Sequence, residues 1–120
     1  MAVIGIGVDI EEISRFQTAG DKLLRRLFTE KELDFCLNSV NPAQHLAARF
    51  CAKEAAYKAL PFKRIAFKNI EVQGGGKSRP VLVIYDDRAK DLDIKLSLSH
   101  TANTAIAFVT VSTKENVKNN

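Results

Sequence analysis

Cysteine is scarce in this sequence, and long apolar runs are missing. Its 120 residues contain two cysteines, Cys36 and Cys51, which do not form a CxxC pair. We therefore expect a cytoplasmic protein with two inert, buried thiols rather than disulfides or a redox centre. No apolar stretch approaches the roughly 20 residues of a membrane-spanning helix. The first apolar run lacks a preceding basic segment, so we expect no signal peptide.

Several catalytic and nucleotide-binding motifs are absent as well. The glycines at 74–76 do not belong to a Walker loop, because the pattern G-x-x-x-x-G-K-[ST] does not occur. Ser99 and His100 are adjacent, and neighbouring residues of a strand point to opposite faces. They are therefore not a catalytic pair, and no aspartate is placed to complete a triad. The sequence also lacks zinc-ligand spacing and an RNP-like aromatic motif.

The charge that is present favours anionic partners. The net charge is +4 and the pI is about 9.2, which suits phosphates, acidic proteins or nucleic acid without choosing among them. Hydrophobic residues make up 46% and charged residues 27% of the chain, which is typical of a soluble globular protein. The length suits one domain over residues 1–120.

Capping and proline signals predict helices in the first half of the chain. Thr29-Glu30-Lys31-Glu32 is a capping box, which predicts a helix to about Leu37. Asn41 and Pro42 predict the start of the longest helix, as cap and first helical residue, and Pro61 ends it after Leu60. A shorter helix is expected over Asp21–Leu27.

Strands are expected at the N-terminus and through the second half. The predicted strands are Ala2–Val8, Ile70–Gln73, Val81–Tyr85, Ile94–Ser99 and Thr104–Val111, with a glycine-rich hairpin loop after Gln73. We also expect a short helix over Asp86–Leu92, and a polar tail from Ser112 that frays. The sequence therefore predicts an α+β fold, with helices of the N-terminal half packed on a small antiparallel sheet.

Asp9 stands where the first strand is expected to stop. Apolar residues recur at helical spacing after it, and Asp9 with Glu12 fits the acid-x-x-Glu form of a helix N-cap. The alternative is a metal ligand. Gly5 and Gly7 before it mark a place where another group approaches the strand backbone closely.

Glu54 and Lys58 lie together on the flank of the long helix. A glutamate four residues before a lysine is the favourable order for a helical ion pair. The side chains around them are small, which indicates either a ligand cleft or a close helix–sheet contact. These small residues are Ala47, Cys51, Ala55 and Ala59, and the expected core stripe is Leu46, Phe50, Tyr57 and Leu60.

Three segments together resemble a known family. They are GIGVDIEEISRF (residues 5–16), RFCAKEAAYKAL (49–60) and LSLSHTANTAIAFV (96–109). In this order and spacing they resemble the holo-acyl-carrier-protein synthases, the small bacterial 4′-phosphopantetheinyl transferases. The resemblance extends over nearly the whole chain. It implies the 4′-phosphopantetheinyl transferase fold and a homotrimer with sites between subunits.

The resemblance also implies a reaction. A 4′-phosphopantetheine group would move from coenzyme A to a serine of apo acyl carrier protein in fatty acid biosynthesis, leaving adenosine 3′,5′-bisphosphate. Asp9 and Glu54 match the magnesium-binding positions of the family, and Mg²⁺ prefers such oxygen ligands. By the same resemblance Lys58 contacts the pyrophosphate, and Glu54 is our candidate for the general base.

Further residues are implied in binding the two substrates. Arg49 and His100 match positions that hold the 3′-phosphate end of coenzyme A, with Ser99 and Thr101 supplying nearby hydrogen bonds. The acidic carrier protein would dock on a basic surface, and the candidates are Arg15, Lys22, Arg25 and Arg26. The alternative for each of these four is an ordinary solvated helix face.

The chain departs from the family at two places. Pro61-Phe62-Lys63-Arg64 replaces a common Gly-Thr-Gly segment, so Lys63 and Arg64 are possible substitutes for its phosphate contacts. Lys77 lies in a hairpin that differs from the usual Gly-Lys-Pro. Two other functions compete with the enzyme: a small basic nucleic-acid-binding module without catalysis, and an interaction protein without chemistry.

Overall fold

The computed structural model describes residues 2–114. Strand β1 (Val3–Glu12) comes first and is followed by three helices, α1 (Asp21–Leu27), α2 (Glu30–Leu37) and α3 (Pro42–Ala59). The remaining strands are β2 (Ile70–Gly75), β3 (Ser78–Ile84), β4 (Leu92–His100) and β5 (Thr104–Thr113). The α+β class predicted from the sequence is confirmed.

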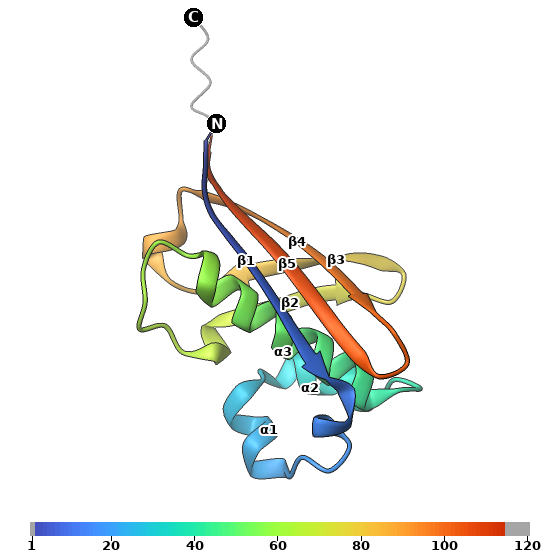
Figure 1. The fold of residues 1–120 in the computed structure, drawn as a ribbon. Coiled ribbons are helices and arrows are strands. Elements are labelled where there is room, and N and C mark those ends of the chain that lie inside the picture. The colour runs from blue at the N-terminus through green and yellow to red at the C-terminus, as the bar shows by residue number, and fades with distance from the viewer. Residues whose placement is uncertain (1, 115–120) are drawn as a thin grey trace, which may run out of the picture.

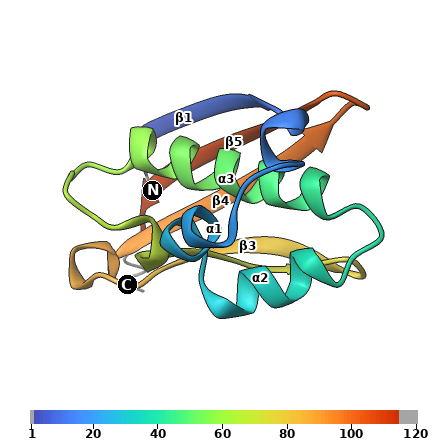
Figure 2. The ribbon, with the colours of Figure 1, turned by 90° about the horizontal axis from the view of Figure 1, so that it is seen from below.

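The strands of this region form two antiparallel sheets instead of the single sheet expected. β5 lies between β1 and β4 in a three-stranded sheet, whereas β2 and β3 form a separate hairpin. Helix α3 crosses one face of the three-stranded sheet (Figure 1). Helices α1 and α2 lie on the side of α3 that faces away from β1 (Figure 2). The core therefore has α3 at its centre.

β1 and α3 approach each other unusually closely. A Cβ atom added at Gly7 would lie 2.0 Å from the carbonyl oxygen of Ala55, and one at Gly5 would lie 1.9 Å from that of Ala59. Since Cβ atoms do not approach oxygen so closely, only glycine fits at these two strand positions. The small side chains on α3 are all buried, namely Ala47, Cys51, Ala55 and Ala59. Of the two alternatives for them, the close helix–sheet contact is correct.

The first strand is longer than predicted, and the cap assigned to Asp9 is wrong. Asp9 lies inside β1 opposite Ala107, and the pairing continues to Glu12 opposite Thr104. Instead of the expected helix, only a 3₁₀ turn follows, over Ile13–Phe16. Hydrogen bonding to β5 outweighs the local helical pattern, as tertiary contacts commonly do.

The other predicted elements need smaller corrections. The capping box at Thr29 is confirmed, but the Asn41 side chain makes no cap hydrogen bond and donates to Gln44 Oε1 at 3.0 Å. The helix expected over Asp86–Leu92 is a 3₁₀ turn, Asp87–Ala89, because β4 already begins at Leu92. A third 3₁₀ turn covers Phe67–Asn69. Of the core stripe, Tyr57 is only half-buried. The tail does not fray from Ser112 as expected, because Ser112 and Thr113 still belong to β5 and pair with its neighbours. The tail beyond Lys114 lies outside the described residues.

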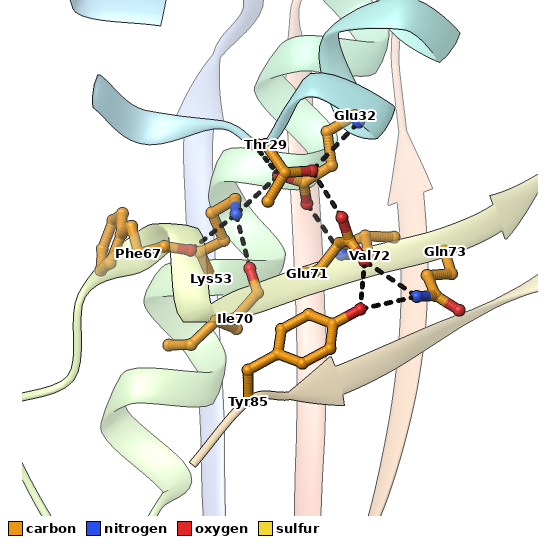
Figure 3. A network of polar contacts seen from close by, with 9 residues as sticks. All are labelled: Thr29, Glu32, Lys53, Phe67, Ile70, Glu71, Val72, Gln73 and Tyr85. Carbon is orange, nitrogen blue, oxygen red and sulfur yellow. Dashed lines mark hydrogen bonds and ion pairs between the residues drawn. The ribbon is translucent and has the colours of Figure 1, made fainter. Parts of the chain in front are cut away.

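A buried ion pair joins α2, α3 and β2 (Figure 3). Lys53 and Glu32 are fully buried, and their charged atoms lie 2.7 Å apart. The Glu32 carboxylate also accepts from the backbone N–H of Thr29 at 2.9 Å and of Val72 at 2.7 Å. The Lys53 ammonium donates to the carbonyl of Phe67 at 2.8 Å. Each charge is thus matched by several partners, as buried charges require.

We expect Lys53→Ala to lower the free energy of unfolding by about 3–5 kcal/mol, because it leaves the Glu32 carboxylate buried and uncompensated. Urea denaturation followed by circular dichroism measures the effect. Arg25→Ala is the control, since Arg25 forms an exposed pair with Asp21, and it should denature like the wild type. A Lys53→Ala midpoint equal to that of the control would contradict the structural role of the pair.

Candidate functional site

Asp9 and Lys58 meet where β1 crosses α3. The ammonium of Lys58 donates to the carbonyl of Val8 at 2.9 Å and lies 3.4 Å from Asp9 Oδ1. The Asp9 side chain is only 13% exposed, whereas that of Lys58 is 53% exposed. The helical ion pair expected between Glu54 and Lys58 is not formed within residues 2–114. Lys58 contacts Asp9 instead, because the strand lies within its reach.

One oxygen of Asp9 is left without a partner. Oδ2 is buried and accepts no hydrogen bond from any residue in the described part of the chain. Leaving a buried acceptor unsatisfied is costly, and a charged one more so, which marks this oxygen as a candidate ligand atom. The same residues contain no group of three or more His, Cys, Asp and Glu arranged around a metal position. A cation here would therefore need water or substrate oxygens as further ligands.

Glu54 and Glu11 surround Asp9 with further negative charge. Burial raises the pKa of Glu54, and the charge of Asp9 raises it further, against the opposing effect of Lys58 and Arg15. Burial also raises the pKa of Glu11, and the neighbouring Asp9 raises it further, against the opposing effect of Arg15, with which Glu11 forms an ion pair. Asp9, Glu11 and Glu54, the carboxylate cluster, thus interact across the β1–α3 contact. The sequence analysis missed Glu11 because the strand was expected to end at Val8.

A second site, the Arg49 pocket, is a cavity of about 370 Å³ formed by α2, α3, the β2–β3 hairpin and β4. Three of the predicted coenzyme A residues line it: Arg49, Ser99 and His100. Its other lining residues are Phe35, Gln44, His45, Ala48, Gly75, Gly76, Ser78, Pro80 and Leu98. His45 lies one turn before Arg49 on α3, so helical spacing could have indicated it, and Gln44 precedes it on the same helix. Only the fold brings Phe35 of α2 to Arg49.

Polar contacts orient the residues at the β4 end of the Arg49 pocket. One ring nitrogen of His100, Nε2, lies 2.9 Å from the Gln44 side-chain nitrogen Nε2. Burial lowers the pKa of His45, and the charges of Arg49 and His100 lower it further, which favours a neutral ring. The hydroxyl of Thr101 accepts from the backbone N–H of Thr104 at 3.0 Å and does not line the pocket. Thr101 therefore stabilises the β4–β5 turn.

Within one chain the two sites face different directions. Asp9, Glu54 and Lys58 do not line the Arg49 pocket. On α3, Arg49 and Glu54 are five residues apart, which corresponds to about 140° around the helix. The structure thus brings together Asp9, Glu54 and Lys58 in one place, and Arg49, Ser99 and His100 in another.

The basic residues predicted for protein docking are exposed near the carboxylate cluster and along α1. Arg15 lies on the 3₁₀ turn after β1, with its guanidinium 5.5 Å from the centre of the Phe50 ring. Lys22, Arg25 and Arg26 are exposed on α1, and Arg25 forms an ion pair with Asp21 at 2.9 Å.

The three basic residues at the departures from the family pattern, Lys63, Arg64 and Lys77, do not line the Arg49 pocket. The ammonium of Lys63 donates to the carbonyl of Tyr57 at 2.7 Å, near the end of α3. Arg64 has a positive φ of 64°. Lys77 is exposed at the hairpin turn.

Comparison with known proteins identifies the family. A family model described as the 4′-phosphopantetheinyl transferase superfamily matches residues 5–109. The chain is 39% identical over 113 residues to the holo-[acyl-carrier-protein] synthase of Thermodesulfovibrio yellowstonii, covering 90% of this chain and 97% of that one. It is 41% identical over 117 residues to that of Halothermothrix orenii, covering 88% and 94%. The chain therefore belongs to the 4′-phosphopantetheinyl transferase superfamily and, within it, to the holo-[acyl-carrier-protein] synthases.

Solved structures show the same fold. The synthase of Bacillus anthracis in complex with CoA (3′,5′-ADP) superposes with a TM-score of 0.80 at 30% identity, covering 95% of this chain and 100% of that one. The synthase of Helicobacter pylori in complex with coenzyme A gives 0.77 at 28% identity, covering 89% and 99%. The comparisons favour the transferase over the nucleic-acid-binding and non-catalytic alternatives. No helix within residues 2–114 has the length and apolar character needed to span a membrane.

Because the carboxylate cluster depends on the close β1–α3 contact, we expect Gly7→Ala to reduce both stability and transfer activity. Its Cβ would collide with the backbone of Ala55, and such overpacking typically costs about 1–3 kcal/mol. Thermal unfolding and a transfer assay measure the two effects. Gly20→Ala is the control, because no described atom outside its immediate neighbours lies within 4 Å of a Cβ added there. Equal unfolding temperatures and equal transfer activities of the two variants would show that β1 shifts to accept the methyl group, and would contradict this prediction.

Proposed function

We propose that this synthase transfers the 4′-phosphopantetheine group of coenzyme A to a serine of apo acyl carrier protein at a magnesium site built on Asp9 and Glu54. The products are the holo carrier protein for fatty acid biosynthesis and adenosine 3′,5′-bisphosphate. The observation that carries the proposal is the buried, unpartnered Oδ2 of Asp9 beside the Glu54 carboxylate. Two neighbouring carboxylates, one of them with an oxygen that has no protein partner, suit a divalent cation.

The residues present fit magnesium. Mg²⁺ usually binds one or two carboxylates and completes its coordination with water and phosphate oxygens. Asp9 and Glu54 provide two carboxylates, and the described residues provide no larger metal-binding group. When bound, the ion would neutralise charge on the diphosphate of coenzyme A.

Lys58 and Glu54 would have different roles beside the proposed magnesium site. The half-exposed ammonium of Lys58 is held by the Val8 carbonyl, so it is oriented to bind the pyrophosphate. Glu54 is the candidate general base for the carrier serine. Without a bound ion, burial and the charge of Asp9 raise the pKa of Glu54.

The nucleotide end of coenzyme A is assigned to the Arg49 pocket. Arg49 and His100 would hold the 3′-phosphate, and Ser99 would add a hydrogen bond from the pocket wall. Thr101 contributes by shaping the turn beside His100. Relatives with the same fold were solved in complex with coenzyme A, which supports coenzyme A as a ligand of this chain.

A homotrimer with sites between subunits would unite the carboxylate cluster with the Arg49 pocket of a neighbour. Support comes from the outer apolar face, the side of the three-stranded sheet that points away from α3. It exposes Ile4, Ile6, Val8 and Ile10 of β1 and Ile106 and Phe108 of β5. Val8 is opposite Phe108 and Ile10 is opposite Ile106, so the patch is continuous. Continuous exposed apolar surface of this kind typically marks a protein interface.

The acidic carrier protein would dock on Arg15, Lys22, Arg25 and Arg26. Arg15 connects this basic surface to the site through its ion pair with Glu11. We further propose a single domain over residues 1–120 and a cytoplasmic location. Both thiols are free and buried, and burial raises the pKa of Cys36 and of Cys51 to about 12. Such thiols are unreactive and suit a reducing compartment.

For catalysis, we expect Asp9→Asn and Glu54→Gln each to lower magnesium-dependent transfer by at least about 100-fold, because each removes one anionic ligand oxygen. The assay mixes enzyme, coenzyme A, Mg²⁺ and apo carrier protein, and detects phosphopantetheine on the carrier by mass spectrometry. Glu12→Gln is the matched control, since Glu12 is exposed at the end of β1.

Transfer by Asp9→Asn at the rate of the control would overturn the assignment of the metal site. A wild-type enzyme that leaves a competent carrier unmodified would overturn the proposed reaction itself. Circular dichroism of each variant verifies that the fold is retained.

For assembly, we expect Ile6→Glu to convert the trimer into monomers and to abolish transfer, because it buries charge in the proposed interface. Ile6 is 63% exposed in the single chain. Light scattering after size-exclusion chromatography measures the mass. Val40→Glu is the control: Val40 is also exposed but lies in the α2–α3 loop, away from the outer apolar face. A monomeric wild type with full activity would refute shared sites.

A further inference from the structure

Arg49 is a buried cation without an acidic partner. The residue is only 3% exposed, and its guanidinium forms no ion pair with any acid in residues 2–114. One of its nitrogens, Nη2, donates to the Gly74 carbonyl at 2.8 Å, and another, Nε, is buried with no partner there. Burial lowers the pKa of Arg49, which reflects the cost of keeping this charge out of water.

The aromatic ring of Phe35 provides the contact that a carboxylate does not. The centre of the guanidinium lies 4.2 Å from the centre of the Phe35 ring, well within the range of a cation–π interaction. The interaction leaves the guanidinium with its full positive charge. An acid at this position would neutralise it and repel a phosphate.

The same ring is held rigidly from two other sides. The imidazole of His45 meets it edge-on, with ring centres 5.3 Å apart and planes at 89°. At the hairpin tip, a Cβ added to Gly75 would lie 3.1 Å from Cζ of Phe35, so the backbone there approaches the ring directly. Phe35 is thereby fixed between α2, α3 and the hairpin, and the guanidinium that rests on it is fixed as well.

We propose that Phe35 is a positioning residue that orients the Arg49 guanidinium toward the 3′-phosphate of coenzyme A. The inference rests on the proposed binding of that phosphate in the Arg49 pocket and adds a specificity role for a residue of α2. Phe35 acts on the phosphate only through Arg49. Its loss should therefore matter for coenzyme A and not for 3′-dephospho-coenzyme A, which lacks this phosphate.

The test is steady-state kinetics of Phe35→Leu with both substrates. Leucine keeps an apolar side chain but has no ring face, so we expect the KM for coenzyme A to rise on the order of tenfold, as the loss of a desolvated cation–π contact allows. The KM for 3′-dephospho-coenzyme A and both kcat values should stay within about twofold of the wild type. Leu37→Ala, an exposed position on the same helix, is the control and should change neither KM.

Arg49→Gln and the double variant Phe35→Leu/Arg49→Gln distinguish the positioning role of Phe35 from the proposed binding of the 3′-phosphate by Arg49. Arg49→Gln should raise the KM for coenzyme A but not that for 3′-dephospho-coenzyme A. Adding Phe35→Leu should raise the KM for coenzyme A little further, because both substitutions act through one contact. If Arg49→Gln affects both substrates equally, the 3′-phosphate assignment is wrong and the inference fails with it. The 3′-phosphate assignment stands but the role of Phe35 is refuted in two cases. In the first, Arg49→Gln raises only the KM for coenzyme A while Phe35→Leu raises the KM for both substrates. In the second, the double variant raises the KM for coenzyme A by the product of the two single effects.

Discussion

The contact between β1 and α3 is the constraint on which the site depends. Two glycines let the strand backbone lie against the carbonyl oxygens of Ala55 and Ala59, where no other residue fits. Asp9 lies two residues after Gly7 on the same face of β1. Its side chain is therefore placed beside Glu54 and Lys58 of the helix. The distance of the strand from the helix therefore sets the distance between the proposed metal ligands.

The two buried cations of α3, Lys53 and Arg49, have different kinds of partners. Lys53, next to Glu54 in the sequence, is neutralised by Glu32 and by backbone carbonyls, and it holds α2, α3 and β2 together (Figure 3). Arg49 faces an aromatic ring and a single carbonyl, so its charge remains available. The first arrangement suits a structural role, and the second suits the binding of an anion. The difference arises from the partner residues, since both cations lie on the same helix.

Much of the fold and part of the site could be predicted from the sequence. Capping and proline signals located α2 and α3, and the motif segments singled out Asp9, Glu54 and Lys58. The longer β1 could not be predicted, because its last residues form a strand only by pairing with β5, about 100 positions away in the chain. Glu11 was missed for that reason. Phe35 was missed because its role depends on α2 packing beside Arg49, which no local pattern encodes.

The most direct test of this account is a crystal structure of the enzyme with coenzyme A and Mn²⁺, located by its anomalous scattering. The account predicts one ion bonded to carboxylate oxygens of both Asp9 and Glu54 at about 2.1 Å, close to the distance that magnesium adopts. An ion that contacts only one of these carboxylates, or neither, would contradict it.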